Sequence, residues 1–189
     1  PDNFSVTAVG SGLGRTHISF ENALSFLIQP LVQQKPAVLD ADIFYSNRID
    51  TILRTLSTPI LTPHPKEFHV LLKNCGLADT TITEIQQNRF HYVRLFCEKY
   101  PHAVLLLKGA YSLIGQDSRI FVNPLGSAAL AKAGSGDVLT GMIAALAAQG
   151  YNPLDAAITA SLAHAQAATL CTTNYGLTPS TLAETISKL

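Results

Sequence analysis

The sequence AKAGSGDVLTG, residues 131–141, runs directly into the apolar stretch MIAALAAQG, residues 142–150. This pattern predicts a helix over Asp137–Gln149. A helix N-terminus attracts anions because its first N–H groups are unpaired, and glycines let a phosphate approach the backbone closely. Either Gly134–Gly136 form such an anion cradle or Asp137 merely caps the helix, and the local sequence leaves both interpretations open.

Upstream and downstream of this stretch, short apolar or β-rich runs alternate with helical runs. Repeated strand–loop–helix units predict the α/β class, with a mostly parallel central sheet covered by helices on both faces. Ligands of such sheets bind at the carboxyl ends of the strands. We expect strands near 5–10, 37–42, 59–62 and 103–109, a hairpin over 111–124, and helices over 19–34, 66–76, 81–100, from Pro153 to about Thr172, and from Thr178–Pro179 onward.

The composition narrows the classes of function. Hydrophobic residues make up 47% and charged residues 14% of the 189 residues, which indicates one domain with a sizeable core. Thirteen basic and thirteen acidic side chains give no general attraction to nucleic acid or to an anionic membrane. No apolar run reaches the length of a membrane span, and no secretory signal pattern is present. Three widely spaced cysteines favour free thiols in the cytoplasm over disulfides or a zinc site.

Several polar residues follow the expected strands. In TPHPKE, residues 62–67, two prolines stiffen the loop that holds His64 and Glu67, although a plain surface turn would look the same. Lys108 follows a buried strand and either pairs with phosphate or is simply solvated. Asp40 and Asp42 lie on the same side of an extended strand, as rim or structural carboxylates with no catalytic role.

Other motifs are weaker or absent. GSGLG, residues 10–14, lacks the full G-x-G-x-x-G spacing, and no Walker-type phosphate loop or G-x-S-x-G hydrolase motif occurs. His164, within an apolar helical run, is interpreted as a packed and hydrogen-bonded residue rather than a ligand.

Taken in order from Val6 to Ala168, the motifs resemble one family, the ADP-dependent NAD(P)H-hydrate dehydratases. These form the dehydratase domain of the nicotinamide-nucleotide repair enzymes, in the ribokinase-like superfamily. The resemblance is carried by GSGLG, LDAD, LTPHPKE, LLLKGAYSLI, the GSGD helix block and NPLDAAITASLAHAQAA. General sugar and vitamin kinases of the superfamily share only the GxGD theme.

The resemblance implies a three-layer αβα fold and a specific reaction. ADP or ATP would phosphorylate the ring hydroxyl of the S-form of NADH hydrate or NADPH hydrate. Phosphate then leaves and the ring double bond returns, with AMP and phosphate as the by-products when ADP is used. The chemistry needs a base, an anion hole for the transferred phosphoryl group and a pocket for the driving nucleotide. The expected cofactors are ADP or ATP and Mg²⁺.

The family's roles carry over to matching positions of this sequence. Asp137 matches the GxGD aspartate and is the expected base, and the backbone N–H groups of Gly134–Asp137 are the expected anion hole. Glu67 is the expected carboxylate of a Mg²⁺ site. Substrate contacts are expected at Gly12, Gly14, His64 and Asp137, and nucleotide contacts at Lys108, Gly109, Ala110, Tyr111, Ser112, Gly134 and Gly136.

The sequence departs from the family pattern in three places. Lys132-Ala133 stands where many members have a glycine pair, and Tyr111 replaces a glycine and would either crowd or stack on the adenine. Family domains also begin with a further βα region, so residues 1–189 are expected to be the C-terminal portion of a single dehydratase domain. Its exposed sheet edge would favour a homo-oligomer.

Two other functions are compatible with the sequence. A ribokinase-like kinase of a vitamin precursor or sugar would give a stable phosphorylated product. A catalytically incomplete nucleotide-binding module would bind adenine nucleotide with almost no activity. TPHPKE together with KGAYS favours the dehydratase over the kinase.

Overall fold

A six-stranded sheet runs through the centre of the protein, in a computed structural model that describes residues 4–171 and 177–189. The first four strands are parallel neighbours, in the order β1 (Thr7–Val9), β2 (Ala37–Leu39), β3 (Pro59–Leu61) and β4 (Val104–Leu107). A hairpin of β5 (Ser112–Gln116) and β6 (Arg119–Asn123) continues the sheet antiparallel. The prediction of a mostly parallel sheet with a terminal hairpin is confirmed.

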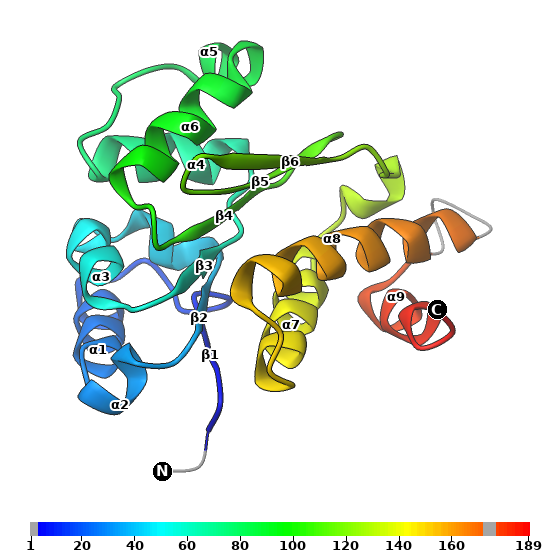
Figure 1. The fold of residues 1–189 in the computed structure, drawn as a ribbon, viewed down its shortest axis with the longest axis horizontal. Helices are drawn as coiled ribbons and strands as arrows, with labels where there is room; N and C mark the ends of the chain where they lie inside the picture. The colour runs from blue at the N-terminus through cyan, green and yellow to red at the C-terminus, as the bar shows by residue number, and fades with distance from the viewer. Residues whose placement is uncertain (1–3, 172–176) are drawn as a thin grey trace.

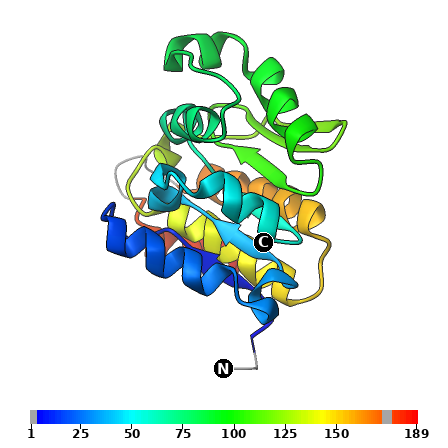
Figure 2. The same ribbon diagram turned by 90° about the vertical axis from the view of Figure 1, so that its left-hand side faces the viewer.

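Helices cover both faces of the sheet and complete three layers (Figure 1). Side chains of β2 alternate between the layers: Ala37 and Leu39 join the apolar cluster that contains Phe68, and Val38 joins the cluster that contains Ile143. Figure 2 looks onto the first helical layer, with the strands and α7 behind it. One side carries α1 (His17–Leu27), α2 (Pro30–Gln33), α3 (Ile49–Thr55), α4 (Pro65–Asn74), α5 (Ile82–Gln87) and α6 (Arg89–Lys99), and the other carries α7 (Ser135–Ala148), α8 (Pro153–Leu170) and α9 (Pro179–Ile186).

Two helices that the sequence predicts as single are each divided in two. The run 19–34 breaks before Pro30, which has no N–H to continue the hydrogen-bond ladder and instead begins α2. The run 81–100 breaks at Asn88, whose backbone is not helical (φ −127°, ψ 39°) and whose side-chain amide donates to the Glu84 carbonyl. Helix α3 and the short 3₁₀ helices η1 (Ala41–Tyr45) and η2 (Ala128–Leu130) were not predicted.

The predicted helix starts are mostly confirmed. Thr81 and Glu84 form a reciprocal capping box, and Asn152 and Thr178 cap α8 and α9. Helix α7 begins at Ser135, two residues earlier than predicted. The expected end of α8 near Thr172 lies outside the described residues. In the ranges that the structure describes, no helix combines the length and apolarity needed to cross a bilayer.

Candidate active site

The loops that follow β1 to β4 meet at one edge of the sheet, as the parallel topology requires. Backbone hydrogen bonds tie them in sequence: Asp40 N–H donates to the Val9 carbonyl at 3.1 Å, and Thr62 N–H donates to the Leu39 carbonyl at 3.1 Å. Lys108 N–H donates to the Pro63 carbonyl at 2.9 Å. The polar residues that the sequence places after separate strands therefore come together here.

A cluster of charged side chains lies at this edge. The Lys108 ammonium is 2.9 Å from Asp40 Oδ1 and 3.9 Å from Glu67 Oε2. The Thr140 hydroxyl of α7 donates to Asp40 Oδ2 at 3.0 Å. Asp40 is 2% exposed, and a carboxylate so deeply buried is tolerated because both its oxygens have partners. Asp40 thus fixes Lys108 against the beginning of α7.

His64 and Glu67 hold each other at the beginning of α4. His64 Nδ1 accepts from the N–H groups of Lys66 (3.1 Å) and Glu67 (3.2 Å), and Glu67 Oε2 accepts from His64 N–H at 2.8 Å. This is a capping box with a histidine in the place of the usual Ser or Thr. Because Nδ1 accepts hydrogen bonds, the ring proton of the neutral form is on Nε2. The predicted place of His64 and Glu67 directly after a strand is confirmed.

The glycine loop after β1 has a left-handed backbone at each of its three glycines. Gly10, Gly12 and Gly14 have φ values of 128°, 67° and 78°. Asp42 binds this loop through both carboxylate oxygens: Oδ2 accepts from Gly14 N–H at 3.1 Å, and Oδ1 accepts from Arg15 Nε at 2.7 Å. An L residue with a side chain would strain this loop.

The predicted relation between Asp40 and Asp42 is wrong. The two were expected on the same side of an extended strand, but β2 ends at Leu39 and Ala41 takes a left-handed conformation (φ 55°). That turn separates the two carboxylates. Asp40 faces Lys108 and Thr140, and Asp42 faces the loop after β1.

His164 of α8 binds the first turn of α7 through Ser135. His164 Nε2 lies 3.0 Å from the Ser135 carbonyl and 3.2 Å from its hydroxyl, and because a carbonyl only accepts, Nε2 is the donor. Burial lowers the pKa of His164, against a smaller opposite effect of the Ser135 hydrogen bond. The prediction of a packed, hydrogen-bonded His164 is confirmed.

Asp137 lies exposed in that first turn and is not the cap. Gly134 is the N-cap residue, with φ 83° and no side-chain hydrogen bond, so the interpretation of Asp137 as a capping residue is wrong. The Asp137 carboxylate makes no hydrogen bond or ion pair with the residues that the structure describes. It is available to a ligand.

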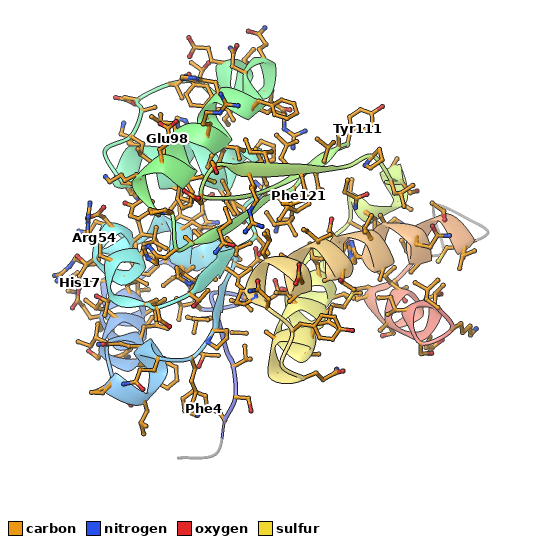
Figure 3. All side chains as sticks on the ribbon, in the orientation of Figure 1. Phe4, His17, Arg54, Glu98, Tyr111 and Phe121 are labelled. Carbon is orange, nitrogen blue, oxygen red and sulfur yellow. The ribbon has the colours of Figure 1, made fainter. Side chains whose placement is uncertain are left out.

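A cavity of about 790 Å³ opens beside the cluster, between the loop after β4 and the segment between β6 and α7. Its size suits a small-molecule or nucleotide ligand. Tyr111 lines it and is 60% exposed, projecting from the beginning of the hairpin (Figure 3). Of the residues predicted to form the site, the lining contains His64, Lys108, Gly109, Ala110, Tyr111, Ser112 and Gly136, and does not contain Gly12, Gly14, Glu67, Gly134 or Asp137.

Some residues of this region were not predicted as site residues. Thr140 donates to Asp40 of the charged cluster, and Arg89 binds the loop after β4. The sequence predicts no role for Asp40 beyond that of a rim or structural carboxylate. The available signal for Asp40 was its place directly after a buried strand.

A model of the NAD(P)H-hydrate dehydratase family matches residues 2–189 of the chain. The chain belongs to this family. Among the relatives of this dehydratase-family chain, the bifunctional NAD(P)H-hydrate repair enzyme Nnr of Helicobacter pylori is 46% identical over 189 residues, which are 100% of this chain and 38% of that protein. The resemblance inferred from the motifs is confirmed.

Solved structures agree with the fold of this dehydratase-family chain. The ADP/ATP-dependent NAD(P)H-hydrate dehydratase of Bacillus subtilis, co-crystallised with ATP/Mg²⁺, superposes with a TM-score of 0.81 at 28% identity, over 97% of this chain and 64% of that one. A ribokinase-like superfamily protein of Enterococcus faecalis, at 21% identity, shows likeness of fold alone (TM-score 0.78, 99% of this chain and 63% of that one). The ribokinase-like three-layer fold is confirmed. The chain spans less than two thirds of each of these relatives.

Proposed function

We propose that this chain takes part in the nucleotide-dependent dehydration of the S-form of NADH hydrate or NADPH hydrate. One observation carries the proposal: the Lys108 ammonium, held by Asp40, lies against the first turn of α7 at the wall of a cavity large enough for a nucleotide. The H. pylori and B. subtilis relatives are named for this reaction or for the repair to which it belongs. Residues 1–189 would contribute the C-terminal portion of one dehydratase domain.

The cavity would hold the driving nucleotide, ADP or ATP. Lys108 and the N–H groups of Gly134, Gly136 and Asp137 would then meet its phosphates, because both supply positive charge on the same side. The Ser135 N–H instead donates to the Lys132 carbonyl at 3.3 Å. Gly109, Ala110 and Ser112 line the same cavity and would contact the adenosine part. Tyr111 would stack on the base at the open side.

The hydrated nicotinamide would lie toward the loop after β1, against Gly12, Gly14 and the half-exposed ring of His64. Asp137 takes the proton of the ring hydroxyl as that oxygen attacks the terminal phosphorus of the nucleotide, and AMP leaves when ADP is the donor. In the second step the ring loses phosphate and a proton, and the double bond returns. Asp137 suits the first step because its carboxylate is exposed and unpaired among the described residues.

Magnesium fits this region through water rather than by direct ligation. Among the described residues no group of three or more His, Cys, Asp or Glu side chains is placed to hold a metal ion. Glu67 is bound to His64 N–H and lies near Lys108, so its carboxylate would reach a cation through water. Mg²⁺ keeps several waters and binds substrate phosphates, whose charge it neutralises. Glu67 would orient those waters.

The setting of the reaction is also proposed. The three free cysteines fit a reducing cytoplasm. The exposed sheet edges fit a homo-oligomer.

The test is a spectrophotometric assay with an Asp137→Asn variant. Hydrated NADH with Mg²⁺ and either ADP or ATP should recover absorbance at 340 nm when the chain is added. The variant should lose at least about a thousandfold in rate, a typical range for a general base being 10²–10⁴-fold, and still bind nucleotide. A Asp155→Asn variant, changed in the first turn of α8 instead, is the matched control and should keep full activity.

Four other results would overturn the proposal. Recovery without nucleotide, or an unchanged rate in Asp137→Asn, would remove the assigned mechanism. A stable phosphorylated product would point to a kinase instead. Nucleotide binding with no turnover, persisting in a chain extended at its N-terminus, would point to a binding module.

A further inference from the structure

We propose that Arg89 is a positioning residue that holds the loop Leu107–Tyr111 in the conformation that binds the nucleotide. This inference rests on the proposed function, since it assumes that the cavity beside this loop holds ADP or ATP. Arg89 is the first residue of α6, far from the loop in sequence, and is not part of the cavity lining.

The Arg89 guanidinium binds three carbonyl groups of the loop. Nη1 donates to the Tyr111 carbonyl at 2.7 Å, and Nη2 donates to the carbonyls of Leu107 at 3.2 Å and Lys108 at 3.4 Å. Both ends of the loop are thus fixed to one rigid, planar group. An arginine fork does this better than a lysine, whose ammonium offers a single point of charge.

Burial of the Arg89 guanidinium has a cost in free energy. It is half buried, and burial lowers the pKa of Arg89. Its Nε is buried and has no hydrogen-bond partner among the described residues. A buried polar group without a partner is destabilising, so the contacts with the three carbonyls must offset that cost.

The contacts also decide where the loop points its N–H groups. In a trans peptide the N–H is directed opposite to the C=O. The first peptide of the loop follows this rule: the Leu107 carbonyl faces Arg89, and the Lys108 N–H points the other way and donates to Pro63. By the same geometry the Gly109 N–H is directed away from Arg89. Gly109 lines the cavity, so this N–H is a donor suited to an anionic nucleotide.

Gly109 is matched to Arg89 by space as well. A Cβ at residue 109 would lie 2.7 Å from Arg89 Nη2 and 3.0 Å from Cζ. A side chain there would displace the guanidinium. The glycine of the KGAYS segment is therefore explained by an arginine on another element.

The test combines nucleotide titration with a double-mutant cycle. Dissociation constants for ADP and ATP are measured by calorimetry for Arg89→Ala, Arg89→Lys, Gly109→Ala and the double variant Arg89→Ala/Gly109→Ala. Arg94→Ala, an exposed arginine on the same helix, is the control. Far-UV circular dichroism and urea unfolding establish that each variant is folded.

We expect Arg89→Ala and Gly109→Ala each to weaken nucleotide binding by tenfold or more, with Arg89→Lys recovering little. At saturating nucleotide the kcat of Arg89→Ala should stay within threefold, because Arg89 positions the loop and lies outside the cavity lining. The double variant should bind no worse than either single variant, since both changes remove the same contact. Additive losses, or binding by Arg89→Ala within twofold of the unmodified chain, would overturn the proposal.

A ligand-free measurement separates this inference from the proposed function. The amide resonance of Gly109 should shift in Arg89→Ala and stay in place in Arg94→Ala. An unchanged Gly109 resonance in Arg89→Ala overturns the role of Arg89. If the unmodified chain binds neither ADP nor ATP while that resonance does shift, the assignment of the cavity to nucleotide fails and the hold of Arg89 on the loop stands.

Discussion

Gly136 leaves space for the ammonium group of Lys108 where α7 meets the charged cluster. A Cβ at residue 136 would lie 3.3 Å from Lys108 Nζ and 3.7 Å from Asp40 Oδ2. Glycine inside a helix costs roughly 0.5–1 kcal/mol relative to alanine. Gly136 lies where Lys108 approaches α7. A substitution of Gly136 should therefore raise the free energy of unfolding and weaken nucleotide binding.

Gly136→Ala should keep or raise the free energy of unfolding, by up to about 1 kcal/mol, because Lys108 Nζ is the end of a flexible side chain and can move aside. The displaced ammonium should weaken nucleotide binding by about tenfold or more. Urea unfolding and calorimetric titration with ADP measure the two effects. Gly141→Ala, in the same helix with no atom within 4 Å of its new Cβ, should gain stability and bind normally. A destabilised Gly136→Ala that binds normally would contradict this account.

The sequence identifies those site residues whose position next to a strand or helix end marks them, and it misses residues without such a mark. Lys108 and His64 are found because they directly follow strands, and Gly136 because it opens an apolar helix. Arg89 and Thr140 have partners 18 to 22 and 100 residues away, so no spacing along the chain marks them. Their importance follows from the tertiary fold alone.

Helix α3 is attached to the end of α6 through the side chain of Asp50. Its carboxylate accepts from Arg54 Nε at 2.9 Å and from the Tyr100 hydroxyl, and Lys99 Nζ lies 3.4 Å away. These partners, the Arg54 hydrogen bond foremost, lower the pKa of Asp50 from 3.8 to about 2. The carboxylate is therefore more stable as an anion in the folded protein than in the unfolded chain.

The contribution of Asp50 should depend on pH in a defined direction. As the pH falls the unfolded chain takes up the proton first, so the stabilisation is complete above about 3.8 and is lost as pH falls through about 2. Asp50 is 34% exposed, and solvent screening reduces the effect to about 1 kcal/mol. Asp50→Asn should lower the free energy of unfolding by that amount at pH 7 and by clearly less at pH 3, in urea titrations. Asp79→Asn, at an exposed carboxylate paired with Lys73, is the control and should change the free energy of unfolding little at either pH. A loss of stability in Asp50→Asn that does not depend on pH would contradict the coupling.

Helix starts that carry a capping residue and a proline can be predicted from the sequence. Breaks inside a helical run are harder to predict. Asn152-Pro153 and Thr178-Pro179 mark helix starts because cap and first-turn proline occur together. The break at Asn88 has no comparable marker, since asparagine also occurs inside helices, and only the structure shows that its side-chain amide binds the Glu84 carbonyl at this point. Helix α3 was missed because its short amphipathic run is shaped by burial of Ile49, Ile52 and Leu53.

At the scale of the whole molecule, the described part of the sheet has β1 at one edge and β6 at the other. The sequence locates an exposed edge at the first strand, and it gives no sign of which edge carries apolar side chains. On β6, Phe121 is 39% exposed and Val122 is 47% exposed. Phe121 is labelled in Figure 3. Proteins usually protect such edges with charges, prolines or bulges. An edge with two exposed apolar residues in a row is suited to pairing with a second copy of the chain.

We therefore expect the chain to form a homo-oligomer through β6, measurable as a dimer or larger species by light scattering coupled to size exclusion. Val122→Lys places a charge on the edge and should shift the mass toward the monomer without lowering the midpoint of urea unfolding, because the side chain is on the surface. Ile18→Lys, at a residue of α1 that is 71% exposed, is the matched control and should leave the mass unchanged. A monomeric unmodified chain, or equal masses for Val122→Lys and the unmodified chain, would exclude β6 as the contact, because a charged side chain on an edge strand disfavours its pairing with a second copy.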